Sequence, residues 1–484
     1  MADAEVKHIV IAGGTAAVVA AAATAISLRG SEIKITLIQL PDDEKTTPIE
    51  VSRGGPQSFH HLLGIDEQTL MKRTGGAFAL GTRYRGFRSE NENVFVPLGS
   101  HGVTLRLVDF HHYAAKLRIE GSNQDYNAYS LPAAAAAAAR FVPPGDTEDP
   151  VQKTVEYDIC IGRDRYLLFM LDLAVELGVT VMLEAIKTVD FGKDGIVDAV
   201  VLANGHRIDG DFFIDCSDGR TLIGRLSTAN DFQDWSSWLP CDRIASVQLK
   251  SLAQPDLFAS IDAHDNGWVQ RIMLSDVGFG SFAYSSQYAD DDFAKRFFEQ
   301  NEVGAAVSDV NVATQRAGCY EAHWVRNCVA LGRAALVLEP MEISSMHLLQ
   351  SSILRLLTML PRRKTSVMLS TEFNRATNEE AASARDYQIL RYALAARRTG
   401  PFWEGSGQTP NPDSLQNRIS LFKTHGRLTG RNHDFISKAR WVSSFINFGF
   451  WPSSYDPLAD MVNEQRMRND VSQFRDAVQR AAEY

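Results

Sequence analysis

The stretch Ile9–Ala20, "IVIAGGTAAVVA", decides the fold. It begins with a short apolar run, continues through two glycines, and enters an alanine-rich segment that reads as a helix ending near Gly30. A second apolar run follows at Ile33–Leu40, "IKITLIQL". A strand, a tight turn, a helix and a second strand in so short a span are typical of the start of a doubly wound parallel sheet. The sequence therefore predicts an α/β, Rossmann-like fold.

The composition narrows the class of protein. The chain has 484 residues, is 45% apolar and carries a formal net charge of −10, which argues against a nucleic-acid-binding protein. Its five cysteines form no CxxC pair, so we expect no metal site and no disulfide framework, and a cytoplasmic location. The uncharged run Ile9–Leu28 is mostly Ala, Gly and Thr, which favours a buried strand and helix over a membrane span.

The remaining chain divides into two parts. Arg163–Gly178 predicts an amphipathic helix, and the following strands with the turn signal Asn204-Gly205 predict a β-meander that returns into a strand ending at Cys216. Short strands dominate Trp238–Tyr288, and the pattern after Thr371 is helical. We predict a split nucleotide-binding-type domain with an inserted β-rich sheet over residues 1–370, and a helical C-terminal region over residues 371–484.

Seven motifs in one order carry a family resemblance. They include "WLPCDR" (238–243), "LEPMEISSMHLLQ" (338–350), "RTGPFWE" (398–404) and "YDPLAD" (455–460). Over essentially its whole length the chain resembles the flavin-dependent tryptophan halogenases. The resemblance implies an FAD-binding fold in which reduced flavin and oxygen oxidise halide. Hypohalous acid is then expected to move through a tunnel to a lysine beside an aromatic substrate.

The first flavin loop of this family follows the pattern GxGxxG, which here falls on Ala12, Gly14 and Ala17. Alanine is tolerated at the third position, and Gly13 adds freedom to the turn. Ala12 would be strained if its position required a positive φ. Gln39 stands where an acidic residue binds the ribose hydroxyls, and an amide accepts hydrogen bonds more weakly than a carboxylate. We expect either a weakened FAD site or a loop that serves only packing.

Two other flavin-contacting loops are also altered. The segment "IEVSRG" (49–54) keeps the family's Glu50 but has Ile49 in place of a glycine. The segment "GRAALVLEPME" (332–342) places Leu336 where a glycine lets the backbone approach the flavin ring. An isobutyl group at that point is expected to take up space that the ring needs.

The residues that the resemblance assigns to halogenation are only partly retained. The catalytic lysine position falls on Ala79, whose methyl group cannot hold or react with hypohalous acid. Glu342 matches the catalytic glutamate, and Ser344 and Ser345 match the small residues at the halide site. A simpler interpretation makes Glu339 and Glu342 capping residues of the next helix.

The route between flavin and substrate is changed as well. The family's tryptophan pair GWxWxIP keeps Trp268 but has Gln270 as its second member. Residues able to line an indole-sized pocket are present, although each also suits a core, namely Phe402, Trp403, Phe448, Phe450 and Trp451.

Because the changes fall on chemical positions while the scaffold motifs are intact, we predict a pseudohalogenase. It would act as a partner or binding subunit of an active homologous halogenase, or as a homo-oligomer. Two alternatives remain open: an active FAD-dependent halogenase, or a flavin monooxygenase or oxidase acting on an aromatic, indole-type substrate.

Overall fold

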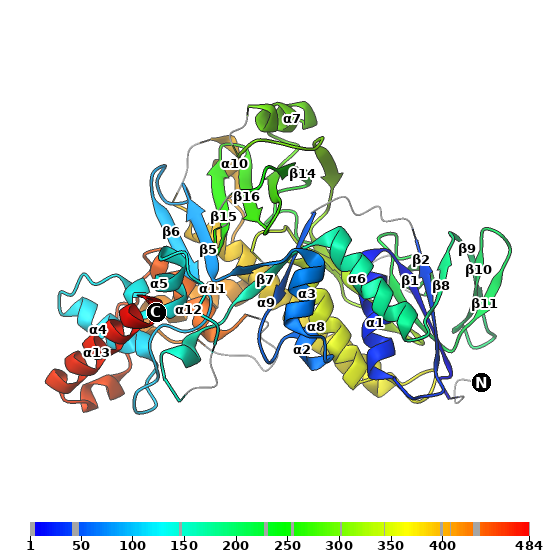
Figure 1. The fold of residues 1–484 in the computed structure, drawn as a ribbon, viewed down its shortest axis with the longest axis horizontal. Coiled ribbons are helices and arrows are strands. Elements are labelled where there is room, and N and C mark those ends of the chain that lie inside the picture. Colours follow the sequence, from blue (N-terminus) through cyan, green and yellow to red (C-terminus); the bar gives the residue numbers. More distant parts are fainter. Residues whose placement is uncertain are drawn as a thin grey trace.

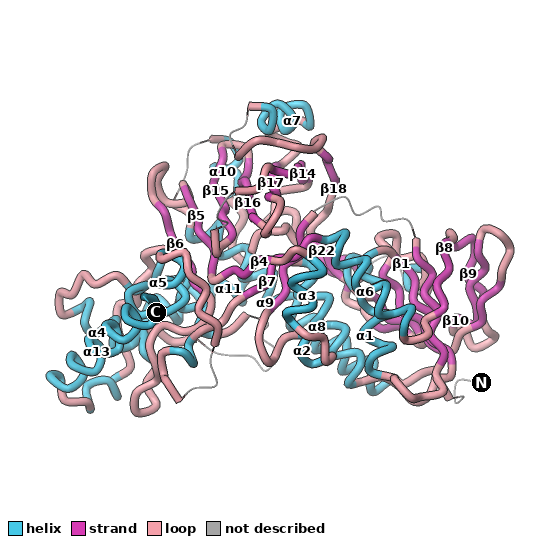
Figure 2. Tube along the Cα trace, viewed as in Figure 1, coloured by secondary structure: helices cyan, strands magenta, loops and turns pink. Residues whose placement is uncertain are grey.

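The computed structural model describes residues 5–40, 48–144, 148–226, 231–252, 256–300, 303–342, 344–396, 400–406, 408–428 and 436–483. The chain begins in a sheet at one end of the molecule, and its last helix lies at the opposite end (Figure 1). Strands form the N-terminal end and the raised middle part, while the other end is built mainly from helices (Figure 2). Within the described residues no helix is both long and apolar enough to cross a membrane.

The first sheet confirms the predicted Rossmann-like opening. Its strand order is β20-β21-β12-β1-β2-β8, and all neighbours except β20 and β21 pair in parallel. The strands are β1 (His8–Gly13), β2 (Lys34–Gln39), β8 (Thr180–Leu183), β12 (Phe212–Cys216), β20 (Trp324–Val325) and β21 (Cys328–Ala330). Helices α1 (Thr15–Ser27), α6 (Arg163–Glu176) and α8 (Ser345–Thr358) pack beside it.

Alternation along β1 explains how the sheet is covered. Ile9 and Ile11 face the core shared with α1 and α6, whereas Val10 and Ala12 face the core formed with the predicted meander. A strand alternates its side chains between two faces, so an all-apolar strand is buried on both. The meander consists of β9 (Ile186–Phe191), β10 (Val197–Leu202) and β11 (Arg207–Asp209).

A seven-stranded sheet forms the raised middle part (Figure 1). Its order is β18-β14-β17-β16-β15-β5-β6. The strands are β5 (Gly81–Arg85), β6 (Asn93–Pro97), β14 (Arg243–Leu249), β15 (Ala259–His264), β16 (Gly267–Met273), β17 (Gly278–Tyr284) and β18 (Asn311–Thr314), and α7 (Asp291–Glu299) packs on one face.

Two three-stranded sheets join the large ones. One pairs β3 (Ile49–Arg53), β7 (Asp158–Gly162) and β4 (Ala77–Ala79), and the other pairs β13 (Phe232–Asp234), β19 (Gly318–Tyr320) and β22 (Leu336–Val337). Nearby lie α2 (Phe59–Leu62) and α3 (Glu67–Thr74). The short 3-10 helices are η1 (Tyr126–Tyr129), η2 (Gln152–Thr154), η3 (Ile223–Arg225), η4 (Gly332–Ala334) and η5 (Pro457–Met461).

The helical pattern predicted after Thr371 is confirmed. It comprises α9 (Val367–Leu394), α10 (Pro401–Ser406), α11 (Asp413–His425), α12 (Lys438–Asn447) and α13 (Glu464–Glu483), with α4 (Phe110–Ile119) and α5 (Leu131–Ala137) added from the first half of the chain. Apart from α5, these helices share one core with the seven-stranded sheet. Because α9 crosses from the first sheet toward this core, it brings residues of the C-terminal region to the loop that follows β22.

Candidate functional site

The turn between β1 and α1 keeps the geometry of a nucleotide-binding loop. The positive φ falls on Gly13 (+145°), where an added Cβ would meet the Cys216 carbonyl at 2.6 Å. Ala12 lies within β1 and carries no positive φ, so the strain considered for this position does not arise. Gly14 is the N-cap residue of α1 and offers no side-chain cap, and the N-terminus of a helix favours an anion. Ala17 is fully buried against the sheet.

Gln39 ends β2 directly beside Gly13. Its Oε1 atom is buried and has no hydrogen-bond partner among the described residues. A buried acceptor without a donor is costly, so this oxygen suits the hydroxyl of a ligand such as a ribose. The turn and Gln39 together fit the nucleotide half of a dinucleotide.

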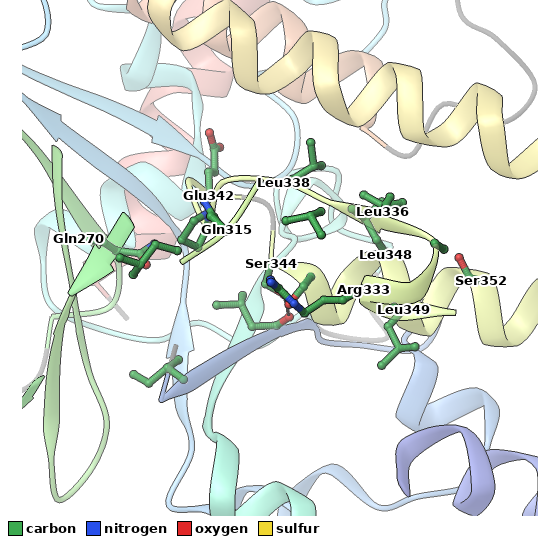
Figure 3. Close-up of a pocket in the computed structure, with 18 of the residues that line it drawn as sticks. Gln270, Gln315, Arg333, Leu336, Leu338, Glu342, Ser344, Leu348, Leu349 and Ser352 are labelled. Atoms are coloured by element: carbon green, nitrogen blue, oxygen red, sulfur yellow. Dashed lines mark hydrogen bonds between the residues drawn. The ribbon is translucent and has the colours of Figure 1, made fainter. Parts of the chain in front are cut away.

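A cavity lies where the flavin-contacting loops meet (Figure 3). It is bordered by β3, by the segment from η4 to Pro340 and by the first turns of α8, and Ile49, Leu336 and Gln270 line it. The space that water can enter is about 60 Å³, whereas small-molecule pockets usually offer about 300–1,000 Å³. Leu336 is held in place because β22 pairs with β19. The cavity is therefore narrow, and the isobutyl group of Leu336 lines it.

Glu342 lies at the end of this cavity in a buried charge cluster. Its backbone has φ +66°, and its side chain is only 2% exposed. Arg391 donates to Oε2 from Nε (2.9 Å) and Nη2 (2.6 Å), and Arg440 donates to Oε1 from Nε (3.1 Å) and Nη2 (2.9 Å). The hydroxyls of Tyr84 and Tyr387 also donate to this carboxylate.

These contacts determine the ionisation of Glu342. Burial works to raise its pKa, but the charges of Arg391 and Arg440 outweigh burial and bring the pKa to about 2. A carboxylate with this pKa, whose oxygens already accept six hydrogen bonds from the four side chains described above, is a poor proton acceptor at neutral pH. The sequence did not point to the arginines, because "RYALAARR" and "KARW" read as ordinary helix segments.

Ala79 ends β4 and is buried among Ile49, Cys160, Ile272, Leu274 and Phe279. Its partner across the strand pair is Asp158. The nearby cations in sequence do not substitute for a lysine here, since Arg73 pairs with Asp172 on the surface at 2.6 Å and Lys72 is exposed.

The two serines sit at the start of α8. The Ser344 hydroxyl accepts from His347 N (3.2 Å) and donates to Val51 O (2.7 Å), and it is therefore the cap of this helix. The interpretation of Glu339 and Glu342 as capping residues is wrong, because both carboxylates point into buried side-chain networks instead. Ser345 and Ser344 both line the cavity.

Trp268 supports the loop before Glu342. Its Nε1 donates to the Tyr392 hydroxyl (3.0 Å), which in turn donates to Glu339 Oε2 (2.5 Å), while Cys241 N donates to Oε1 (2.8 Å). Burial raises the pKa of Glu339 to about 7. Trp268 is fully buried and does not border the cavity, whereas Gln270 does.

The other predicted residues take structural places. Glu50 is buried with Arg163, whose Nε lies 3.8 Å from Oε1. Phe402, Trp403 and Phe448 are at most 1% exposed and pack in the core shared by the helices and the seven-stranded sheet; none of the five aromatic residues considered for an indole pocket borders this cavity. Within the described part of the chain no three His, Cys, Asp or Glu side chains are placed to hold a metal ion.

Comparisons with known proteins agree with this fold. Tryptophan 7-halogenase RebH from Lentzea aerocolonigenes is 25% identical over 439 residues, which cover 86% of this chain and 82% of RebH. Two solved flavin-dependent halogenases each superpose with a TM-score of 0.91 and cover 99% of this chain and 96% of their own: BrvH from Brevundimonas sp. BAL3 (27% identical) and Xcc4156 from Xanthomonas campestris (30%). The family model described as tryptophan halogenase matches residues 7–464. The chain therefore belongs to the tryptophan halogenase family, which implies an FAD-binding fold.

Proposed function

We propose that this protein keeps the halogenase fold but does not halogenate. The observation that carries the proposal is the state of Glu342, whose carboxylate is occupied by Arg391 and Arg440, next to a strand on which the lysine position is Ala79. Halogenation in this family needs an ammonium that directs the electrophile and a carboxylate that assists proton removal. The first is a methyl group here, and the second is saturated with donors.

The cofactor site supports the same proposal. The N-terminus of α1 and the unpaired Gln39 oxygen suit a nucleotide, but the cavity beyond them is narrow and Leu336 borders it. We infer from these features that the protein holds the nucleotide half of FAD better than its tricyclic ring. We expect the purified protein to be colourless and to gain no flavin absorbance when FAD is added. A yellow protein with stoichiometric FAD would contradict this part of the proposal.

A protein with this fold and without the chemistry acts through binding. We propose that it is a partner subunit of an active, lysine-containing homologue. We expect both in the cytoplasm, where the five buried free cysteines stay reduced. Affinity purification of the tagged chain from its source organism tests this role, and a halogenase should be enriched with it. A chain that associates only with itself would instead favour the homo-oligomer.

A second candidate function rests on Gln39. Its unpaired buried oxygen favours a bound ribose, and flavin oxygen chemistry needs no lysine. A flavin monooxygenase or oxidase acting on an aromatic substrate is therefore the alternative. One assay distinguishes the two candidate functions. In it the protein is incubated with reduced FAD, oxygen, bromide and indole. Hydroxylated product, or reoxidation of reduced FAD that is faster than in a protein-free control, favours the enzyme. Brominated indole refutes both candidates, and no turnover above the control favours the binding subunit.

A further inference from the structure

Asp158 lies in β7, between a residue of β3 on one side and a residue of β4 on the other. In the sheet β3-β7-β4, Arg53 pairs with Asp158 on one side and Ala79 pairs with it on the other. Residues directly opposite each other in antiparallel strands project onto the same face, with Cβ atoms about 4.5–5.5 Å apart. A longer side chain at position 79 would thus extend alongside the Asp158 carboxylate.

Asp158 is a buried acid whose described partners are distant. Its side chain is 8% exposed, and Nη1 of Arg440 lies 4.0 Å from Oδ2. His347 Nε2 is 3.7 Å from Oδ1, but burial lowers the pKa of this histidine to about 3, so it carries no charge at neutral pH. Burial raises the pKa of Asp158, and the positive charges of Arg440 and Arg53 act against burial, with Arg440 the larger of the two.

The same guanidinium also holds Glu342. Its Nε and Nη2 atoms face Oε1 of Glu342 at 3.1 and 2.9 Å, which leaves Nη1 turned toward Asp158. The planar fork of arginine allows one side chain to serve two carboxylates in this way. A cation from α12 thus stands between two buried acids, beside a strand position that has only a methyl group.

We propose that Arg440 supplies from α12 the buried positive charge that position 79 lacks, so that Ala79, Asp158 and Arg440 form one electrostatic unit. A positively charged side chain at position 79 or at position 440 stabilises the Asp158 carboxylate. This inference deepens the proposed loss of halogenation and relies on position 79 being the lysine position, but its test measures stability and does not depend on flavin or turnover.

This electrostatic unit determines which substitutions are needed to restore halogenation. An Ala79→Lys change alone places a third cation near Glu342 while Arg440 continues to occupy the carboxylate. The ammonium is then shared with Asp158 and Glu342 stays saturated, so no halogenation is expected. The pair Ala79→Lys with Arg440→Gln is the smallest change that gives a lysine and removes the two Arg440 hydrogen bonds from Oε1 of Glu342, which keeps only that of Tyr387.

The test is a set of thermal unfolding measurements on the full chain. Arg440→Gln is expected to lower Tm by roughly 5 °C, because it removes one of the two cations that hold Glu342 and a cation close to Asp158. Adding Ala79→Lys should recover at least half of that loss, whereas Ala79→Met, which has similar length and no charge, should recover none. Equal effects of Lys and Met, or no recovery by Lys, would overturn the proposal.

Two controls make the test specific. Arg391 binds Glu342 and has no described contact with Asp158, so Ala79→Lys should not rescue Arg391→Gln; equal rescue would count against the proposal. If Arg440→Gln does not fold, the pair Ala79→Lys and Asp158→Asn decides instead. Ala79→Lys should lower Tm several degrees more in the Asp158→Asn background than in the native chain, and equal lowering would overturn the unit. Brominated indole from the native chain would refute the proposed function and leave this coupling untouched.

Discussion

The Nη2 atom of Arg391 lies 2.6 Å from Oε2 of Glu342, and the two side chains are 1% and 2% exposed. Arg391 comes from α9 and Glu342 from the loop after β22, so the ion pair ties the helical part of the molecule to the loop that borders the cavity. In buried ion pairs, removal of one partner leaves a charge that neither water nor protein satisfies. The carboxylate that resembles a catalytic residue is thus a structural anchor.

This anchor predicts a stability effect for Glu342→Gln. The change leaves the guanidinium groups of Arg391 and Arg440 without their carboxylate, and we expect a loss of about 3–5 kcal/mol in the free energy of unfolding. Guanidinium denaturation measures it. The matched control is Asp172→Asn, which removes the exposed partner of Arg73 and should change little. A Glu342→Gln protein as stable as the native one would show that the cluster is not an anchor.

Glu339 predicts a dependence of stability on pH. Burial raises its pKa in the folded protein from 4.5 to about 7. The contribution of this group to the free energy of unfolding is therefore greatest below pH 4.5. That contribution is lost as the pH rises to about 7. Glutamine imitates the neutral acid in charge, and its amide oxygen can accept from Cys241 N or from the Tyr392 hydroxyl, both of which donate to Glu339.

We therefore expect Glu339→Gln to gain stability over the native protein between pH 5 and pH 8, by up to about 3 kcal/mol. Unfolding curves recorded at both pH values measure the difference. A gap between the two proteins that does not change with pH would contradict the assignment of the raised pKa to Glu339.

Leu336→Gly is predicted to widen the cavity. Removing the isobutyl group opens the space in which a flavin ring would lie, and relief of overpacking worth about 1–3 kcal/mol corresponds to about 5- to 160-fold tighter FAD binding. Quenching of FAD fluorescence gives the Kd. Leu338→Ala, which shortens another cavity-lining residue, serves as the control and should bind FAD more weakly than Leu336→Gly.

Gly13→Ala tests the turn of the nucleotide loop. An added Cβ would lie 2.6 Å from the Cys216 carbonyl, in a backbone with φ +145°. Gly30 also has a positive φ (+83°), but an added Cβ there meets nothing within 4 Å. Gly30→Ala should cost about 1 kcal/mol and Gly13→Ala about 3 kcal/mol or more, as measured by urea unfolding. Similar costs at both positions would show that the close approach to Cys216 does not matter.

Much of the fold was predictable from local patterns. The apolar run before Gly13, the alanine-rich helix and the meander signalled by Asn204-Gly205 are all present, because side-chain periodicity and turn residues act over short distances. Leu336 lines the narrow cavity, and its crowding of the ring space stays a prediction.

The site was less predictable. The sequence predicted that Glu342 is a retained catalytic acid or, in the simpler interpretation, a helix cap. In the structure Ser344 caps the helix. Glu342 binds two arginines that lie 49 and 98 residues further along the chain. Ion pairs at this separation leave no pattern in one sequence, because nothing local selects which of the many arginines meets a given acid.

The sequence by itself determined the family, the order of strands and helices, and the absence of a lysine at position 79, since each depends on residue identity or short-range periodicity. Only the tertiary structure decided that α9 and α12 carry Arg391 and Arg440 to Glu342 and that Asp158 lies beside Ala79. These contacts arise because burial excludes water from the place where the sheets and helices meet. Each charge there is stabilised by opposite charges that packing brings from distant segments of the chain.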